Sequence, residues 1–259
     1  MDTFCESVVK RHRTVRLAVF DVDWTLFVGT SAETLLINYL KTVGWFRPAG
    51  VGRGICYALR TLPHGVIEAF LKNKYYLSGL DAESLLGRMD EFHEEWMKPR
   101  LSASMLDQLS RYREKGYELV LLSGTLDFII RTLCGKLDIG NGIGSRVEIR
   151  DSKFTGRVEG MYPIHAQKII LLKRHFAGCM IDWSECAAFG DSYWDIPLLS
   201  RVGRPMAVHP DIGLFREAVR RGWPIERRTV EITSPAQRLW IEQITRRQKS
   251  ISKSFRSHL

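Results

Sequence analysis

Two pairs of aspartates stand where they could take part in phosphoryl chemistry. Asp21 and Asp23 follow one short apolar run, and Asp191 and Asp195 follow another. Carboxylates are the ligands that hard cations such as Mg²⁺ prefer, and a bound cation would cancel the repulsion between an attacking carboxylate and a phosphate dianion. The pairs therefore indicate transfer of a phosphoryl group at a metal-supported site.

The residue chemistry suggests a role for each group in hydrolysis. Asp21 could attack phosphorus in line and form an aspartyl-phosphate, while Asp23 could protonate the leaving oxygen and later deprotonate the hydrolytic water. Lys168 could supply a fixed positive charge, and the Ser123 hydroxyl with its neighbouring backbone N–H groups could bind the phosphoryl oxygens.

The metal would be bound by Asp21, the backbone carbonyl of Asp23 and Asp191, with Asp195 as a further ligand or as the residue that orients a metal-bound water. Each residue also has a structural explanation, because aspartates cap helices, serines occupy turns and helix lysines face solvent. Helix caps and turns do not require the two aspartate pairs, Ser123 and Lys168 to occur together. Their joint occurrence therefore favours the chemical interpretation.

Parallel strands are expected to bring these groups together. Apolar runs at 17–20, 117–122, 187–189 and 205–208 are typical of buried strands, and in open α/β sheets ligands bind at the carboxyl ends of such strands. The alternation between 146 and 159 predicts a hairpin. The fold class is therefore α/β with a mainly parallel sheet.

A helical segment interrupts this pattern between the first two strands. Residues 28–116 show helical spacing with Gly and Pro between the periodic stretches, which predicts an all-helical insertion. We expect three regions: a core formed by 1–27 with 117–230, a helical cap at 28–116, and a basic tail at 231–259.

The sequence resembles the haloacid dehalogenase superfamily of phosphohydrolases. The resemblance is carried by DVDWT at 21–25, Ser123 in SGT, Lys168 on a predicted helix and GDSYWD at 190–195, and it extends over roughly 16–226. It implies a Rossmann-like core with an inserted cap, similar to the phosphoserine phosphatase-like branch, and Mg²⁺ as cofactor. By this resemblance Thr25 is expected to brace the loop of Asp23.

Two departures from the family pattern bear on specificity. Trp24 occupies a slot that generally carries a small residue, so its ring is either a packing substitution or a wall of the substrate pocket. Phosphoserine phosphatases typically follow the serine with Gly and an aromatic residue, whereas Gly124, Thr125 and Leu126 follow Ser123 here. This argues against phosphoserine as the substrate.

Substrate binding is expected to involve both the core and the cap, because a cap that closes over the phosphate excludes water. The substrate-binding candidates are Ser123, Gly124, Trp24, Glu33 and Arg60. The two charged cap residues suit a zwitterionic or anionic leaving group, although charged helix residues usually face solvent.

The net charge of +9 comes from the ends of the chain. Residues 1–16 carry four basic and two acidic side chains, residues 216–259 carry eleven and four, and the remainder is balanced at 23 each. A neutral body argues against a nucleic-acid groove, so no nucleic-acid partner is expected. The tail either contacts anionic lipid headgroups or RNA, or is a disordered solubilising segment.

Cysteine usage and hydropathy favour a cytoplasmic address. The five cysteines contain no CxxC and are expected to be reduced thiols, the first 16 residues lack the apolar stretch of a secretory signal, and no charge-free 18-residue stretch occurs. We expect a Mg²⁺-dependent phosphatase acting on a small organic phosphate ester. The alternatives are a phosphotransferase, a lipid-phosphate phosphatase at a membrane surface, and a noncatalytic phosphoryl-binding scaffold.

Overall fold

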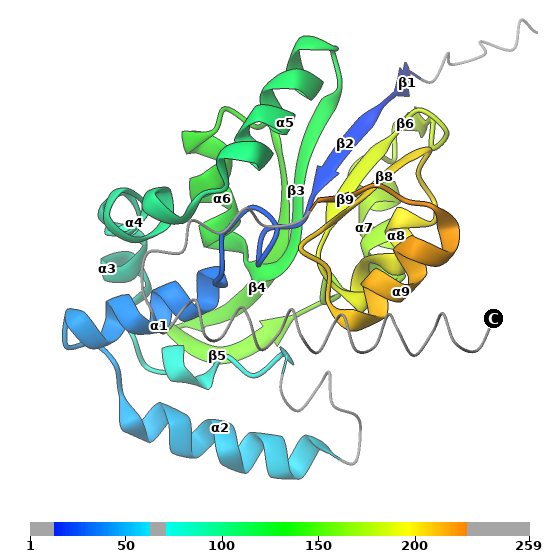
Figure 1. Ribbon diagram of the computed structural model, residues 1–259. Coiled ribbons are helices and arrows are strands. Elements are labelled where there is room, and N and C mark those ends of the chain that lie inside the picture. Colours follow the sequence, from blue (N-terminus) through cyan, green and yellow to red (C-terminus); the bar gives the residue numbers. More distant parts are fainter. Residues whose placement is uncertain (1–12, 63–70, 227–259) are drawn as a thin grey trace, which may run out of the picture. The chain divides into compact units, whose positions relative to one another are not determined.

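Short runs of buried apolar residues form the inner strands of one seven-stranded sheet, in the order β5-β4-β3-β2-β7-β8-β9 (Figure 1). Every neighbouring pair is parallel except β4 with β5. All residues of β2 and β7 are buried, as expected for strands covered on both faces. At the centre, Phe20 stacks on Phe189 with ring centroids 4.3 Å apart. The α/β fold class with a mainly parallel sheet is confirmed.

The structure is a computed structural model and describes residues 13–62 and 71–226. The predictions on the basic tail at 231–259 and on the first 12 residues lie outside this part of the chain. The strands are β1 Arg13–Val15, β2 Leu17–Phe20, β3 Glu118–Leu126, β4 Asn141–Arg150, β5 Lys153–Glu159, β6 Cys179–Ile181, β7 Ala187–Gly190, β8 Arg204–Val208 and β9 Ile225–Glu226. The α-helices are α1 Ala32–Thr42, α2 Pro48–Thr61, α3 Ala82–Leu86, α4 Met89–Phe92, α5 Ala103–Glu114, α6 Asp127–Lys136, α7 Gln167–His175, α8 Ile196–Leu199 and α9 Ile212–Arg221. The short 3₁₀ and π segments are η3 Tyr75–Leu77, η4 His93–Met97, η5 Lys98–Arg100 and η6 Tyr193–Asp195.

Alternation along the central strands divides the core into two layers. Ala18 and Phe20 of β2 face a cluster that includes α1, α5 and α6, whereas Leu17 and Val19 face a second cluster with α7, α8 and α9. Successive strand residues point to opposite faces, so helices on both sides bury both sets. β1 lies outside this sheet and pairs in parallel with β6.

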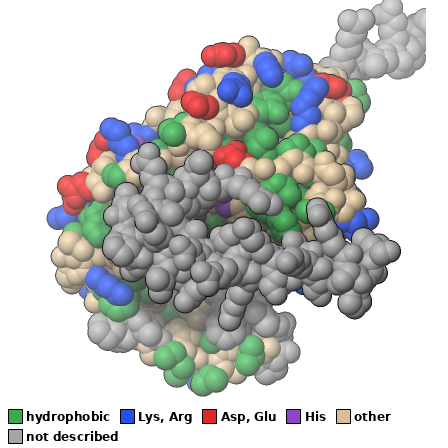
Figure 2. All heavy atoms as spheres, in the orientation of Figure 1, with side chains coloured by type: hydrophobic (Ala, Val, Ile, Leu, Met, Phe, Trp, Pro, Cys, Tyr) green, Lys and Arg blue, Asp and Glu red, His purple; other side chains and the backbone are tan. Residues whose placement is uncertain are grey.

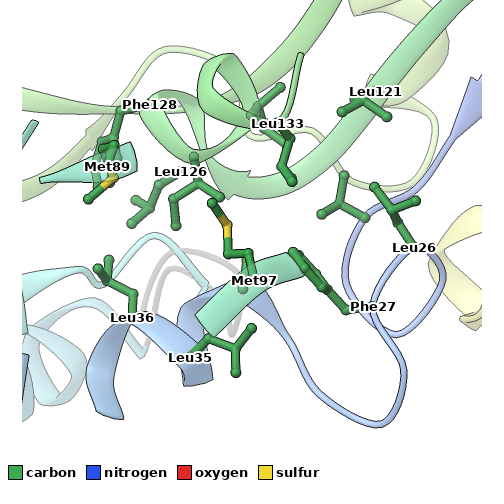
Figure 3. Close-up of a cluster of buried hydrophobic side chains, with 14 of the residues drawn as sticks. Leu26, Phe27, Leu35, Leu36, Met89, Met97, Leu121, Leu126, Phe128 and Leu133 are labelled. Atoms are coloured by element: carbon green, nitrogen blue, oxygen red, sulfur yellow. The ribbon is translucent and has the colours of Figure 1, made fainter. Parts of the chain in front are cut away.

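The described part of the insertion is helical and shares its apolar core with the sheet. Figure 3 shows Phe27 after β2, Leu36 of α1 and Met97 of η4 in one cluster with Leu121 of β3 and Leu133 of α6. Three isolated bridges link this segment to other parts of the chain: Phe27 with Leu101, Asn73 with Arg157, and Asp81 with Lys153. The described residues of sheet and insertion belong to one compact unit, and the division into core and cap stays a prediction.

Two elements differ in extent from the prediction. The strand expected at 117–122 continues through Ser123 to Leu126, because Leu126 pairs with Ser145 of β4 after an irregularity in the register. The hairpin is present, but β4 starts earlier, at Asn141, and its first residues pair in parallel with β3. The hairpin therefore extends the main sheet.

The surface of the described part carries both signs of charge, and Figure 2 shows acidic and basic side chains interspersed over α5. Cys56, Cys134, Cys179 and Cys186 are free thiols. Within residues 13–62 and 71–226, none of the helices combines the length and the apolar character needed to cross a bilayer.

The turn after β2 places a bulky residue in a conformation that favours glycine. Trp24 has φ 58° and is 45% exposed, while its backbone N–H donates to the Thr30 carbonyl at 3.1 Å. The left-handed region costs an L-residue about 1–2 kcal/mol. This explains in physical terms why a small residue suits the slot and why Trp24 strains the turn.

Comparing Trp24→Gly with Trp24→Ala tests this strain. Both variants remove the ring, but only alanine keeps a Cβ in the left-handed region, so we expect the glycine variant to be more stable by about 1 kcal/mol in urea unfolding. At ordinary helical or extended positions alanine is the more stable of the two. The same order here would contradict the proposed backbone strain.

Candidate active site

The carboxyl ends of β2 and β7 place the two aspartate loops next to each other. The strands are parallel neighbours with Phe20 opposite Phe189, so Asp21 and Asp191 emerge at the same edge of the sheet. The Asp21 backbone N–H donates to the Phe189 carbonyl at 3.0 Å, which joins the loops directly. This edge is where ligands bind in α/β sheets of this kind.

Lys168 connects the two loops through its ammonium group. Its Nζ donates to Asp21 Oδ1 at 2.6 Å and to Asp195 Oδ1 at 2.5 Å, and all three residues are buried. Burial alone would lower the pKa of Lys168, but the charges of Asp195 and Asp21 outweigh it and raise the pKa. Lys168 in α7 is thus held as a cation beside Asp21.

Asp195 is fixed as the second carboxylate partner of Lys168. Its Oδ2 accepts from the Ser192 backbone N–H at 3.2 Å and from the Ser192 hydroxyl at 3.0 Å, in a capping box at the start of η6. A Cβ at position 190 would lie 2.6 Å from the Asp195 carboxyl carbon, so Gly190 is needed for this approach. Both carboxylate oxygens of Asp195 therefore accept hydrogen bonds from other groups of the protein.

Asp191 lies in the same cluster of charges. Burial, followed by the charges of Asp21 and Asp195, raises the pKa of Asp191 to about 9, and burial is likewise the main cause that raises the pKa of Asp21 to about 7. The hydroxyl of Thr25, which is fully buried, donates to Asp191 Oδ1 at 3.4 Å. Thr25 therefore contacts the Asp191 loop directly.

The donor set at this edge suits a magnesium ion. In the part of the chain that the structure describes, no group of three or more His, Cys, Asp and Glu side chains is arranged to hold a metal. Mg²⁺ is usually bound by only one or two carboxylates, with waters and substrate phosphate completing the octahedron. Buried carboxylates with raised pKa values also need a cation if they are to be ionised near neutral pH, so Asp21 and Asp191 fit such an ion.

Asp23 is held by one residue of the inserted segment and one residue of the sheet. Its Oδ1 accepts from the Ala32 backbone N–H at 2.7 Å and its Oδ2 from the Thr125 hydroxyl at 2.7 Å. Burial raises the pKa of Asp23, and the bonds from Thr125 and Ala32 oppose this. The Thr125 hydroxyl can also accept a hydrogen bond, so it can stay paired when Asp23 is protonated.

Ser123 and Gly124 lie within β3, close to the same groups. The Ser123 hydroxyl, buried in the strand, donates to Thr125 Oγ1 at 3.4 Å. A Cβ at Gly124 would lie 2.6 Å from the Tyr162 hydroxyl oxygen, so only glycine leaves room for this ring. The buried ring of Tyr162 therefore lies against Gly124 of β3.

The remaining substrate-binding candidates are Glu33, Arg60 and Trp24, and their side chains differ in how near they lie to the site. Glu33, in the first turn of α1, follows Ala32 and pairs with the buried Lys74, whose Nζ lies 2.6 Å from Glu33 Oε2. Arg60 is exposed in the last turn of α2, and no contact among the described residues joins it to Asp21 or Asp23. Trp24 adjoins Asp23 but is largely exposed.

Sequence reasoning assigned no role to Thr125 or Lys74. A signal for Thr125 was present, because it stands where phosphoserine phosphatases carry another residue after the motif serine. Lys74 offered no such signal: its contact with Glu33 spans 41 positions and depends on how the insertion folds.

The comparisons agree with this geometry. The family model for haloacid dehalogenase-like hydrolases matches residues 18–200. A histidinol-phosphatase of Neisseria meningitidis serogroup C is 31% identical over 219 residues, covering 81% of this chain and 97% of that protein. A phosphoserine phosphatase, SerB1, of Mycobacterium tuberculosis is 26% identical, covering 80% of this chain and 69% of that protein. A crystal structure of a protein of unknown function from Bordetella pertussis Tohama I has a TM-score of 0.69 at 25% identity, over 83% of this chain and 99% of that one.

The chain belongs to the haloacid dehalogenase-like hydrolase family. An apo phosphoserine phosphatase structure shares the fold, with a TM-score of 0.57 at 18% identity over 83% of this chain and 94% of that one. The expectation of an enzyme of the phosphoric monoester hydrolase class is confirmed at this level.

Thr125→Val tests the bond to Asp23 because it keeps the shape of the side chain and removes only the hydroxyl. A hydrogen bond to a charged group contributes about 1.5–3 kcal/mol, so we expect kcat to fall about tenfold or more on an alkyl phosphate with little change in KM. The burst of p-nitrophenolate released from p-nitrophenyl phosphate, which reports the first step alone, should slow less, because this leaving group needs no proton. Thr125→Ser should restore the alkyl ester activity, and an equal loss of the burst rate and of alkyl ester turnover would count against a positioning role.

Asp191→Asn should reduce the pH dependence of stability in the metal-free protein. The folded-state pKa of about 9 lies above the ordinary value of 3.8, so the folded state holds this proton more tightly and loses stability as pH rises between the two values. In EDTA we expect the variant to gain thermal stability over the wild type at pH 9 and to show a smaller gain at pH 5. Asp107→Asn, at an exposed position of α5, is the control. The same gain at both pH values would exclude ionisation of Asp191 as the cause.

Proposed function

We propose that the chain is a Mg²⁺-dependent phosphatase that hydrolyses a small organic phosphate monoester through an aspartyl-phosphate on Asp21. The observation that carries this proposal is the buried cluster in which Lys168 joins Asp21 to Asp195 beside Asp191. The names of two relatives, histidinol-phosphatase and phosphoserine phosphatase, support a small phosphate ester as the substrate class.

In the first step the Asp21 carboxylate attacks phosphorus. Lys168 holds Oδ1 at 2.6 Å and so orients the carboxylate, while its positive charge also favours the approach of a phosphate dianion. The new Asp21–phosphorus bond forms as the bond to the ester oxygen breaks. Asp23 donates its proton to that oxygen, which leaves as an alcohol.

In the second step water replaces the enzyme oxygen on phosphorus. Asp23, now ionised, takes a proton from the water as it attacks, and Asp21 is released as a carboxylate together with inorganic phosphate. Raising the pKa of Asp23 by burial suits this double use, because the group must both give and accept a proton. The Ser123 hydroxyl donates to Thr125 Oγ1 and would turn from it to donate a hydrogen bond to a phosphoryl oxygen.

The carboxylates of Asp21 and Asp191, with the backbone carbonyl of Asp23, would hold the magnesium ion. When bound, Mg²⁺ supplies positive charge that offsets the repulsion between carboxylate and phosphate and stabilises charge on the phosphoryl oxygens. Asp195 is already bonded to Lys168 and Ser192. We therefore assign it a positioning role rather than direct metal binding.

A noncatalytic scaffold and a lipid-phosphate enzyme are weaker candidates. Loss of a reacting group would favour a scaffold, but Asp21, Asp23, Asp191 and Lys168 are all present. The membrane alternative depends on the tail at 231–259, which lies outside the described residues. A phosphotransferase would use the same first step and differ only in the acceptor, so product analysis with added alcohols separates it from a hydrolase.

Asp21→Asn tests the nucleophile directly. We expect p-nitrophenyl phosphate turnover with Mg²⁺ to fall by at least about 1,000-fold, because an amide cannot form the acyl phosphate. EDTA should abolish wild-type activity, and added Mg²⁺ should restore it. Asp107→Asn serves as the matched control and should retain activity. Full activity of Asp21→Asn, or metal-independent turnover by the wild type, would refute the mechanism.

A further inference from the structure

A cavity of about 320 Å³ lies at the edge of the sheet opposite to the active site. Arg16 directly precedes β2, Tyr117 directly precedes β3, and Arg204 begins β8. Because these strands run in parallel, they all begin at one edge and end at the other (Figure 1). The cavity is therefore separate from the cluster around Asp21 and Asp191. Its lining residues are Arg16, Tyr112, Lys115, Tyr117, Glu185 and Arg204.

Positive charge predominates among the lining side chains. Arg16, Lys115 and Arg204 are cations, and Glu185 is the one carboxylate of the lining. Glu185 Oε2 lies 2.8 Å from Arg204 Nη2, so this carboxylate compensates the charge of Arg204. The charges of Arg16 and Lys115 have no carboxylate partner in the lining. The cavity thus carries an excess of two positive charges.

The tyrosine rings hold the cations in place. The Arg16 guanidinium carbon lies 4.8 Å from the ring centroid of Tyr117, and its Nη2 donates to the Lys115 carbonyl at 3.0 Å. Arg204 Nη1 donates to the Tyr117 hydroxyl at 2.5 Å. Lys115 Nζ lies 5.8 Å from the ring centroid of Tyr112. Side chains that are already positioned lose less conformational entropy when a ligand binds.

The cavity offers more hydrogen-bond donors than acceptors. Among the described residues, the Lys115 ammonium and the Tyr112 hydroxyl form no hydrogen bond, and the Tyr117 hydroxyl accepts from Arg204 without donating. Burial, followed by the influence of Tyr117, raises the pKa of Tyr112, so its hydroxyl stays protonated as a donor. A ligand that only accepts hydrogen bonds would use these N–H and O–H groups.

A phosphate group matches both the charge and the donors of the cavity. Its oxygens accept charge-assisted hydrogen bonds from guanidinium and ammonium groups, and the planar guanidinium fits phosphate geometry. The double negative charge of a phosphate monoester equals the excess of two positive charges, whereas a single carboxylate would cancel only half of it. Ligand sites usually measure about 300–1,000 Å³, so a cavity of about 320 Å³ suits a small ligand.

We infer that this cavity is a second binding site, which takes a phosphate group either as inorganic phosphate or as part of a small organic phosphate. The inference goes beyond the proposed phosphatase function and does not depend on it, because none of the lining residues takes part in that mechanism.

Titration of the wild-type protein with inorganic phosphate, followed through the backbone amide signals in NMR spectra, tests the inference. EDTA is present, because without a metal the buried carboxylates of the active site repel an anion. We expect saturable shifts at Gly116 and Tyr117, with a Kd of about 1 mM or below at low ionic strength. The signals of Asp21 and Asp191 serve as the internal comparison.

A titration with benzylphosphonate distinguishes the two sources of the phosphate group. Benzylphosphonate stands in for an organic phosphate, because its carbon–phosphorus bond is not a phosphate ester and its ring can pack against Tyr112 and Tyr117. Binding about threefold or more tighter than that of inorganic phosphate indicates an organic ligand. Equal or weaker binding indicates the free ion. Saturable binding of either probe at the cavity supports the inference.

Substitutions in the lining test which groups bind the anion. Lys115→Gln removes one of the two uncompensated charges and should weaken phosphate binding about tenfold, while Tyr112→Phe removes a donor and should weaken it about threefold. Glu185→Gln removes the carboxylate of the lining and should strengthen binding about threefold, a gain that loss of structure cannot produce. Lys98→Gln, at an exposed position of η5, is the matched control and should leave the affinity unchanged.

Three outcomes would overturn the inference. The first is the absence of saturable shifts at Gly116 and Tyr117 with phosphate up to about 10 mM. The second is a set of shifts confined to Asp21 and Asp191, which would make the active site the place of binding. The third is an unchanged affinity in Lys115→Gln. Turnover of p-nitrophenyl phosphate does not enter these outcomes, so failure of the phosphatase proposal is a separate result.

Discussion

An ammonium ion buried between two carboxylates is the constraint on which the rest of the site depends. Lys168, Asp21 and Asp195 are all removed from water, and an unpaired ion in such a place costs several kcal/mol, on the order of 3–5 when one partner of a buried pair is deleted. The short bonds at 2.6 and 2.5 Å offset that cost only while α7, β2 and η6 keep their positions. Packing of the sheet and reactivity of the site are therefore coupled.

The same cluster explains why the edge of the sheet favours a further cation. Asp21, Asp191 and Asp195 outnumber Lys168, and burial with mutual repulsion raises the pKa of Asp191 to about 9 and that of Asp21 to about 7. Lys168 relieves only part of this repulsion because its bonds go to Asp21 and Asp195. The protein thus keeps Asp191 next to an excess of negative charge that a divalent cation can offset.

Much of this could be predicted from the sequence because the information is local. Short apolar runs predict the strands, and parallel strands share one edge, so the aspartates that follow β2 and β7 had to meet. The extent of β3 was predicted less well. Ser123 looked like a residue beyond a strand end, whereas pairing of Leu126 with Ser145 carries the strand past it.

Long-range contacts of the insertion could not be predicted, since they have no signature in residue spacing. Thr125 reaches Asp23 across 102 positions and Lys74 reaches Glu33 across 41. Each contact depends on a neighbour that brings the backbone into place, as Gly156 of the hairpin does for Lys74. A lysine on a polar segment reads as a solvent-exposed residue until the partner that buries it is known.

The two buried lysines belong to different parts of the fold. Lys168 stands on α7 and its Nζ contacts Asp21, so its charge is suited to the phosphoryl group of the proposed substrates. Lys74 stands on the inserted segment and pairs with Glu33, while its backbone N–H donates to Gly156 of the β4–β5 hairpin. Because the hairpin rather than the aspartate loops positions Lys74, the Glu33–Lys74 pair can change without moving Asp21, Asp191 or Lys168.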